Sequence, residues 1–407
     1  MTYSNKVKSK GSVFEYIVVL SILLASGTTS FNVMHAGITL VGFLCVAVIY
    51  ALKNKFSIRK LPFFFWAYVT FIFVDYMIHG LEMKLVEHAF CLGCTTLILL
   101  SMDYKRFRRV YLNVIVILVL VSILLQIAYL ADLIEPQLQF VGSDSSMGFY
   151  VYAFHTFGGA KWGLHNQLAG IFWEPGIYQM ALNSALLLNT DLIFNFKKQK
   201  YSKIKFLLIT IAVLLTQSTT GYLVYGTIIL GVVLGQDKLK TPRNIALILL
   251  GMVASVVVLN SSVVQDKFST DNASYLVRMN DNFALLNMIA DSPLLGSGVY
   301  SETYQKSADF YGMTGAQSNG LLLATAQYGV FWALFFVIGV IKEYKKRTPK
   351  INVLFYLGAF IMMNIGEPLS FAPFMLMFVL PFKYYNNETS NSRYSYLQHG
   401  SFAATMS

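Results

Sequence analysis

Charged residues are scarce in this chain: Asp, Glu, Lys and Arg make up 13% of its 407 residues. A soluble globular protein carries about a quarter of such residues, so the composition excludes an ordinary water-soluble domain. Apolar side chains take their place, with 56% of the residues hydrophobic and 15% aromatic. They come in blocks of about 16–22 residues, enough to cross a bilayer core at about 1.5 Å per residue. The composition therefore predicts an all-α polytopic membrane protein.

Basic residues are almost missing from every second connection between these blocks. Of the 31 Lys and Arg residues, 26 fall in the alternate connections and the two tails. By the positive-inside rule, that side is the cytoplasm, which places both termini there. The net charge of +11 is then a feature of topology and lipid headgroups rather than of nucleic-acid binding. The outer side has five cations: Lys84, Lys161, Lys267, Arg278 and Lys306.

Twelve apolar blocks make one predicted membrane domain, residues 1–385, and a Ser-, Asn- and Tyr-rich stretch at 386–407 is expected to be a disordered cytoplasmic tail. Two outer loops are long, at about 133–174 and 261–318, so polar chemistry collects at the outer membrane boundary. A transporter would instead keep its loops short and its polar residues within the spans. The expected spans are about 13–29, 32–52, 61–79, 86–101, 110–132, 175–195, 205–217, 220–235, 244–260, 319–341, 351–365 and 370–385.

Cysteine is also rare, with Cys45, Cys91 and Cys94 as its three positions. Cys91 and Cys94 share a helix face and suit either a redox or metal pair, or close packing between helices. No other thiol or nearby histidine completes a zinc set, so packing is favoured. The outer segments hold no Asp-x-Asp pair and no His pair at helical spacing. We therefore expect neither a metal nor a cofactor.

An isolated arginine lies in the second outer loop. Arg278 belongs to a predicted amphipathic helix at about 274–291, which Pro293 ends. A guanidinium binds phosphate through paired hydrogen bonds, so Arg278 is a candidate anion clamp. The alternative is a surface charge paired with Asp281, one turn later on the same face. Asp281 is also a candidate for substrate binding. The apolar stripe that predicts this helix is Leu276, Met279, Phe283, Leu286 and Ala290.

Two carboxylates stand at outer helix boundaries among apolar neighbours. Glu174 precedes Pro175, a residue suited to the first turn of a helix, whose dipole favours a carboxylate there. A helix-start signal alone would explain Pro175, but it explains Glu174 less well, because this carboxylate stands among apolar residues near the membrane. Glu367 lies between the last two spans. Both are candidate functional groups, and Tyr178, one turn after Glu174, is a candidate for substrate binding.

Further polar candidates flank these carboxylates. Gln317 and Asn319 precede the span at 319–341, where amides either cap the helix or bind sugar hydroxyls. Lys161, His155 and His165 lie in the first outer loop, where each could bind an anion or move a proton.

Five short sequences together resemble the Wzy-type O-antigen and capsular polysaccharide polymerases, within the O-antigen polymerase and ligase superfamily. The resemblance covers about 165 to 340. The resemblance rests on the order of the five sequences and on their common side of the membrane, because each sequence alone is a weak signal. The sequences are GIFWEPGIY at 170–178, LLTQSTTGY at 214–222, YLVRMNDNFALL at 275–286, SPLLGSG at 292–298 and QSNGLLLATAQYG at 317–329.

The resemblance implies a GT-C-like helical fold and a metal-independent, inverting glycosyltransferase. Its substrates are undecaprenyl-pyrophosphate-linked oligosaccharides at the outer face of the bacterial inner membrane, with the growing chain as donor and the incoming repeat unit as acceptor. Arg278 matches the arginine that engages the donor pyrophosphate, and Glu174 matches the acidic residue. A chain-length regulator and a flippase are the implied protein partners.

Two departures keep alternatives open. The ligase branch of the superfamily carries a histidine where Gln317-Ser318 stands here, which disfavours a ligase. Polymerases often carry an arginine in the first outer loop, where this chain offers Lys161, a cation without the planar fork. A lipid-oligosaccharide flippase is the alternative from another class, but it needs charges inside a central cavity.

Overall fold

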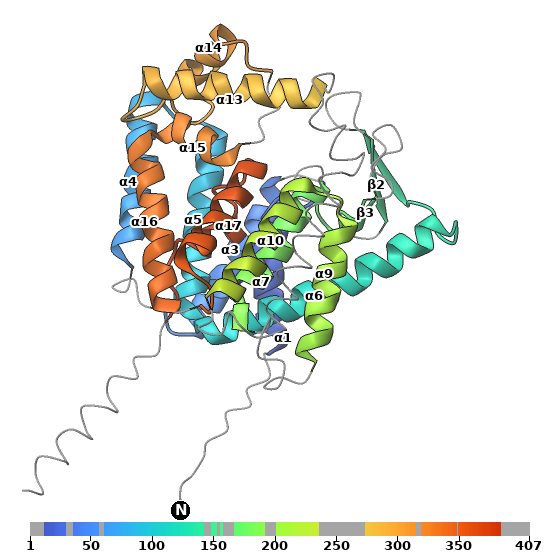
Figure 1. Ribbon diagram of the computed structural model, residues 1–407. Coiled ribbons are helices and arrows are strands. Elements are labelled where there is room, and N and C mark those ends of the chain that lie inside the picture. The colour runs from blue at the N-terminus through green and yellow to red at the C-terminus, as the bar shows by residue number, and fades with distance from the viewer. Residues whose placement is uncertain are drawn as a thin grey trace, which may run out of the picture.

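A computed structural model describes residues 12–29, 36–56, 61–141, 148–152, 155–157, 167–191, 201–235, 273–314, 319–347 and 349–383. The fold is mostly helical, as expected, with a small antiparallel sheet in the first of the two long loops (Figure 1). The strands are β1 Leu138–Val141, β2 Gly148–Tyr152 and β3 His155–Phe157. The helices are α1 Val13–Leu24, α3 Ala36–Lys53, α4 Phe63–His79, α5 Met83–Ser101, α6 Tyr104–Leu130, α7 Pro175–Leu188, α9 Ser202–Leu215, α10 Thr219–Leu234, α13 Ala273–Asp291, α14 Glu302–Phe310, α15 Gly320–Tyr328, α16 Val330–Arg347, α17 Val353–Gly366 and α18 Pro373–Leu376.

Two of the described helices, α5 and α6, are long and apolar enough to cross a membrane. Five shorter helices, α1, α3, α4, α10 and α17, are also apolar. Many large apolar side chains on these helices point outward, such as Leu52, Phe73 and Leu124, which are 74%, 57% and 65% exposed. Exposed apolar surface on this scale marks an interaction site with an apolar environment.

Helix α7 is the central element of the bundle. It packs against α6, α9, α10 and α17, and almost all of its residues are buried. One polar side chain of α7 joins it to α10: the Asn183 amide donates to Gln179 Oε1 at 2.9 Å and to the Gly221 carbonyl at 3.2 Å. Because α7 is enclosed on all sides, the residue at its N-terminus is held by the whole bundle.

Two predicted spans are wrong as single helices. The block at 319–341 is broken at Gly329 (φ +85°), where a side chain would overlap the backbone of Leu294. The block at 370–385 is helical only in α18, and turns follow it. There the buried Arg347 donates to the carbonyls of Met377 and Leu380 at 2.7 and 3.3 Å, which satisfies groups that helical bonds would otherwise engage. The predicted span at 244–260 and the tail at 386–407 lie outside the described residues.

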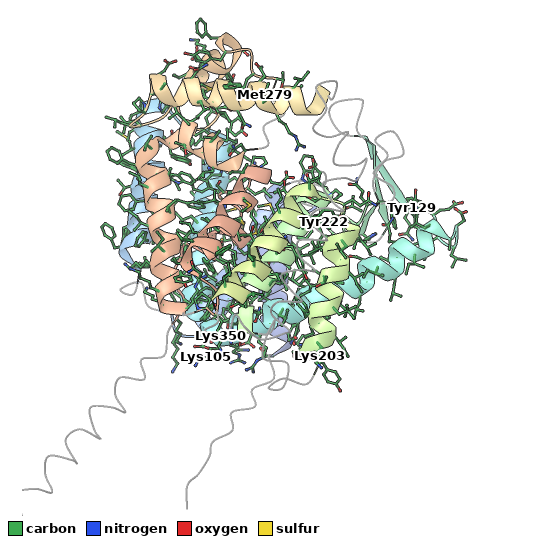
Figure 2. The ribbon with its side chains drawn as sticks, viewed as in Figure 1. Lys105, Tyr129, Lys203, Tyr222, Met279 and Lys350 are labelled. Carbon is green, nitrogen blue, oxygen red and sulfur yellow. The ribbon has the colours of Figure 1, made fainter. Side chains whose placement is uncertain are left out.

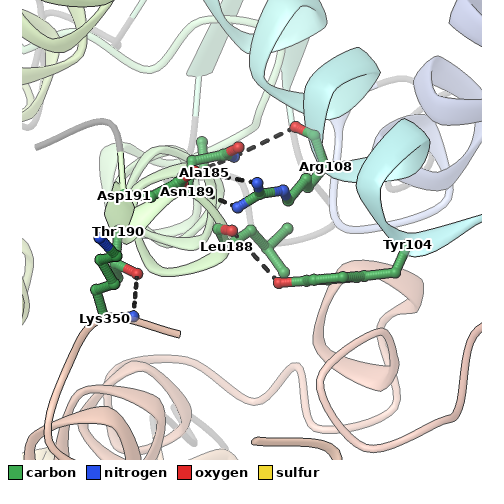
Figure 3. A network of polar contacts seen from close by, with 8 residues as sticks. All are labelled: Tyr104, Arg108, Ala185, Leu188, Asn189, Thr190, Asp191 and Lys350. Carbon is green, nitrogen blue, oxygen red and sulfur yellow. Dashed lines mark hydrogen bonds and ion pairs between the residues drawn. The ribbon is translucent and has the colours of Figure 1, made fainter. Parts of the chain in front are cut away.

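The two ends of the bundle differ in chemistry. Figure 2 shows Lys105, Lys203 and Lys350 at one end, and Met279 of α13 at the opposite end. Ion pairs fix the basic end: Arg108 makes two hydrogen bonds to Asp191, at 2.8 and 3.1 Å (Figure 3). The sequence predicts one common side of the membrane for these lysines, and the fold gathers them at one end of the bundle.

The amphipathic helix forms as predicted, and α13 lies across the other end of the bundle (Figure 1). Its buried face, however, is not the predicted apolar stripe. Ala284, Leu285 and Met288 are buried, at 2%, 1% and 0% exposure. The predicted stripe is exposed, with Leu276, Met279, Phe283 and Leu286 between 41% and 59% accessible. Helix α13 has two apolar stripes. The stripe that was not predicted is the one that packs against α14 and α15.

Candidate active site

Four segments that are distant in the sequence meet at the end of the bundle where α13 lies. Glu174 precedes α7, Glu367 follows α17, Asn319 precedes α15, and Arg278 projects from α13. A side chain on Gly176 would overlap the Glu367 carboxylate, and one on Gly320 would overlap the Glu367 carbonyl oxygen. The starts of α7 and α15 therefore both lie directly against Glu367.

Glu174 occupies the N-cap position of α7 with an extended backbone (φ −136°, ψ 148°). Its carbonyl accepts the first helical hydrogen bond from Tyr178 N at 3.2 Å, but its side chain does not cap the helix. A carboxylate at an N-cap would ordinarily accept from the next turn. The side chain of Glu174 is therefore available for another task.

The two carboxylates and the arginine interact electrostatically. Burial raises the pKa of Glu174, and the nearby Arg278 partly offsets this. Burial raises the pKa of Glu367 well above its usual value, the Glu174 charge raises it further, and Arg278 lowers it. Two carboxyl groups close together cannot both ionise easily, so the pair retains a proton at a pH where isolated carboxylates have lost theirs. A pair of this kind can accept and release a proton in a reaction.

Arg278 is exposed. No described carboxylate lies within ion-pair distance of its guanidinium, although it is close enough to Glu174 and Glu367 to lower their pKa values. Arg278 therefore lies near two carboxyl groups without forming a salt bridge to either of them. An arginine in this state can bind a further anion.

A glycine turn after α13 anchors that helix to the bundle. Ser297 N and Gly298 N donate to the carbonyls of Ala326 and Gln327 at 2.8 and 3.1 Å. Gly296 (φ +72°) sits so close to the Gln327 carbonyl that a side chain would overlap it. Val330 N donates to the Pro293 carbonyl at 2.8 Å, where α16 begins. These bonds fix the position of α13, and hence of Arg278, over the carboxylates.

Three other predicted site residues have packing or capping positions. Asp281 is buried and accepts from the Thr314 amide and hydroxyl at 2.8 and 2.9 Å, so it is not the partner of Arg278. Tyr178 is fully buried and stacks on Phe172 at 5.6 Å. Asn319 caps α15 through a bond from Leu322 N to its Oδ1 at 3.1 Å. These contacts give the three side chains packing and capping roles.

The remaining candidates are only partly described. Lys161 and His165 of the first outer loop, and Gln317 at the end of the second, lie outside the described residues. His155 is in β3, is 2% exposed and packs edge-on against Phe157 at 4.7 Å. Burial lowers the pKa of His155 to about 4, so this imidazole stays neutral.

The role of the glycines beside the two carboxylates was not predicted from the sequence. Gly176 and Gly320 leave the space that Glu367 occupies, and Gly221 approaches Gln179 of α7 in the same manner. The signal was present as the sequences Glu174-Pro175-Gly176 and Asn319-Gly320, where glycine begins a helix that would otherwise favour another residue.

Within the described part of the chain, no group of three or more His, Cys, Asp and Glu side chains could hold a metal ion. Cys91 and Cys94 are buried in α5. Comparisons of the chain with protein-family models, with curated proteins and with solved structures find no match.

Proposed function

We propose that this chain is a polysaccharide polymerase that joins lipid-pyrophosphate-linked oligosaccharide units, and that Arg278, Glu174 and Glu367 form its active site. The observation that carries the proposal is the convergence of these three residues from three separate segments. Each was selected from the sequence on its own, and their electrostatic coupling makes them one site.

The sidedness of the bundle supports the proposed location. The chain would be a multi-pass protein of the bacterial plasma membrane, with about twelve spans and both termini in the cytoplasm. The site lies at the end of the bundle opposite Lys105, Lys203 and Lys350 (Figure 2), and basic residues mark the cytoplasmic side. The site would therefore face outward, where an isoprenoid pyrophosphate can reach Arg278 while its lipid stays in the bilayer.

The proposed reaction exchanges one bond at the anomeric carbon of the donor. The acceptor hydroxyl attacks that carbon, and the bond to pyrophosphate breaks with its electron pair going to the leaving oxygen. Arg278 stabilises the charge that develops on the pyrophosphate. The proton of the acceptor hydroxyl passes to the carboxyl pair, with Glu174 as the accepting base. Attack from the face opposite the leaving group inverts the configuration.

The flippase alternative has less support. Two arginines near the start of α6 are paired with carboxylates: Arg106 with Glu15 at 2.6 Å and Arg108 with Asp191 at 2.8 Å. A transport pathway would need such groups within a central cavity, whereas the centre of α7 is tightly packed. A ligase would use the same site but transfer the glycan to a different acceptor.

A deletion experiment separates the three functions. Cells without this chain should carry surface glycan of a single repeat unit on its normal carrier. Loss of a ligase would instead leave long polymer on the isoprenoid lipid, and loss of a flippase would trap single units on the inner leaflet. Either of those outcomes would overturn the proposal.

A further inference from the structure

A cavity of about 90 Å³ opens beside the carboxyl pair, several times the volume that one water molecule needs. Its walls come from the start of α5, from α15, from the end of α1 and from the segment after Glu367. Two wall residues join it to the candidate active site: Pro368 follows Glu367 directly, and Gly320 packs on the Glu367 carbonyl. The cavity thus begins one residue away from a carboxylate of the site.

The rim of the cavity is electrically balanced. Lys84 donates to both oxygens of Glu87, at 2.8 and 2.7 Å. Because this ammonium already has a carboxylate partner, the cavity has no net charge to attract a phosphate. Arg278, in contrast, has no ion-pair partner among the described residues. The two neighbouring sites therefore suit different parts of one substrate.

Aromatic rings form another part of the lining. His88 stacks on Phe371 with ring centres 4.1 Å apart and planes 6° apart, and its Nδ1 is 2.9 Å from the Tyr328 hydroxyl. Tyr300 also lines the cavity. A ring face that this stack leaves free attracts the slightly positive C–H bonds of an apolar ring face.

A buried amide completes the set. Gln327 lines the cavity at 2% exposure, and its Nε2 has no hydrogen-bond partner among the residues that the structure describes. A buried amide donor without a partner is unfavourable, so a ligand hydroxyl at this position would remove that penalty. Glu87 and Ser370 add polar atoms to the same lining.

We propose that this cavity is a subsite for a neutral sugar ring of the oligosaccharide, next to the sugar that reacts. Aromatic faces with an amide and a carboxylate match a ring that has apolar C–H faces and hydroxyl groups at its edge. This proposal rests on the proposed function, since it assigns part of the same substrate.

The test is a binding measurement with two separate probes on the full-length protein in lipid nanodiscs. The first probe is the free repeat-unit oligosaccharide, released from its lipid and carrying no phosphate. The second is inorganic pyrophosphate. Gln327→Leu should weaken oligosaccharide binding at least tenfold and leave pyrophosphate binding unchanged. Arg278→Ala should do the reverse.

A second variant guards against a folding defect in Gln327→Leu. Ala324→Leu keeps every polar group but fills the cavity, and it should also weaken oligosaccharide binding alone. Wild-type oligosaccharide affinity in both variants would overturn the subsite, as would weakened pyrophosphate binding in place of sugar binding. Gln327-dependent oligosaccharide binding in a protein that makes no polymer would leave the subsite standing while the polymerase proposal fails.

Discussion

The carboxylate of Glu367 occupies the space where a side chain on Gly176 would lie. This contact ties the C-terminal end of α17 to the first turn of α7, across 190 residues of sequence. It brings Glu367 to Glu174, and the pair lies within electrostatic range of Arg278. Because the three groups lie together, substitutions can test the contribution of each one separately.

Gly176→Ala should displace the Glu367 carboxylate and lower polymerase activity by about a hundredfold, since a misplacement of about 1 Å can have that effect. The fold should survive, because the overlapping atom is the end of a flexible side chain. Polymer length on gels measures the activity, and thermal unfolding in detergent measures the stability of the fold. Gly226→Ala is the matched control, since no atom of the described residues lies within 4 Å of its added methyl group. Equal activity of the two variants would contradict the expected placement of Glu367.

Arg278→Ala should abolish polymer while the protein still inserts. Arg278→Lys should also be severely impaired, because a point charge does not replace the planar fork. Lys306→Ala is the control: this exposed cation on α14 pairs with Glu302, and its loss should leave the ladder of chain lengths unchanged. A wild-type ladder from Arg278→Ala at equal expression would refute the clamp.

The pH dependence of activity should show two limbs. Burial raises both carboxyl pKa values, so Glu174 becomes a base only as pH rises above its elevated pKa, and activity should rise with it. At higher pH Glu367 ionises as well, and the second negative charge repels the pyrophosphate, so activity should fall. Polymerisation rates of the purified protein, measured over a range of pH, follow both limbs.

Two amide variants assign these limbs. Glu174→Gln should be inactive at every pH, because an amide cannot take the proton. Glu367→Gln mimics the protonated acid, so it should keep the acid limb and lose the alkaline one. If Glu174→Gln polymerises normally, Glu174 is only a helix-entry residue.

Arg347→Met should destabilise the basic end of the bundle by about 3–5 kcal/mol, because it leaves the buried Glu343 and two carbonyls without this partner. Lys346→Met is the control. Lys346 also pairs with Glu343, at 2.8 Å, but its side chain is 39% exposed, and such a pair contributes about 0–1 kcal/mol. Denaturant unfolding in micelles compares the free energies of unfolding of the two variants. An equal loss of stability in both would show that the burial of Arg347 does not set the size of its contribution.

The sidedness can be tested by labelling single cysteines in a background without Cys45, Cys91 and Cys94. A cysteine at Lys306 should react with an impermeant maleimide in intact cells. Cysteines at Lys105 and Lys350, at the other end of the bundle, should react only after permeabilisation (Figure 2). The reverse pattern would invert the topology and place the candidate site in the cytoplasm.

The sequence alone identified most of the helices, because runs of apolar residues specify a helix through local periodicity and length. It also selected Arg278, Glu174 and Glu367, since each is a charge in an apolar or oppositely charged context. The helix of Arg278 was predicted within one or two residues of α13.

Only the tertiary structure decided which of these residues meet. The buried face of α13 was predicted wrongly because the helix has two apolar stripes, and local sequence cannot say which one finds a partner. The break at Gly329 and the turns after α18 depend on contacts with Leu294 and Arg347, which are remote in the sequence. The carboxyl pair exists for the same reason: two helix ends far apart in the chain come together where glycine leaves room.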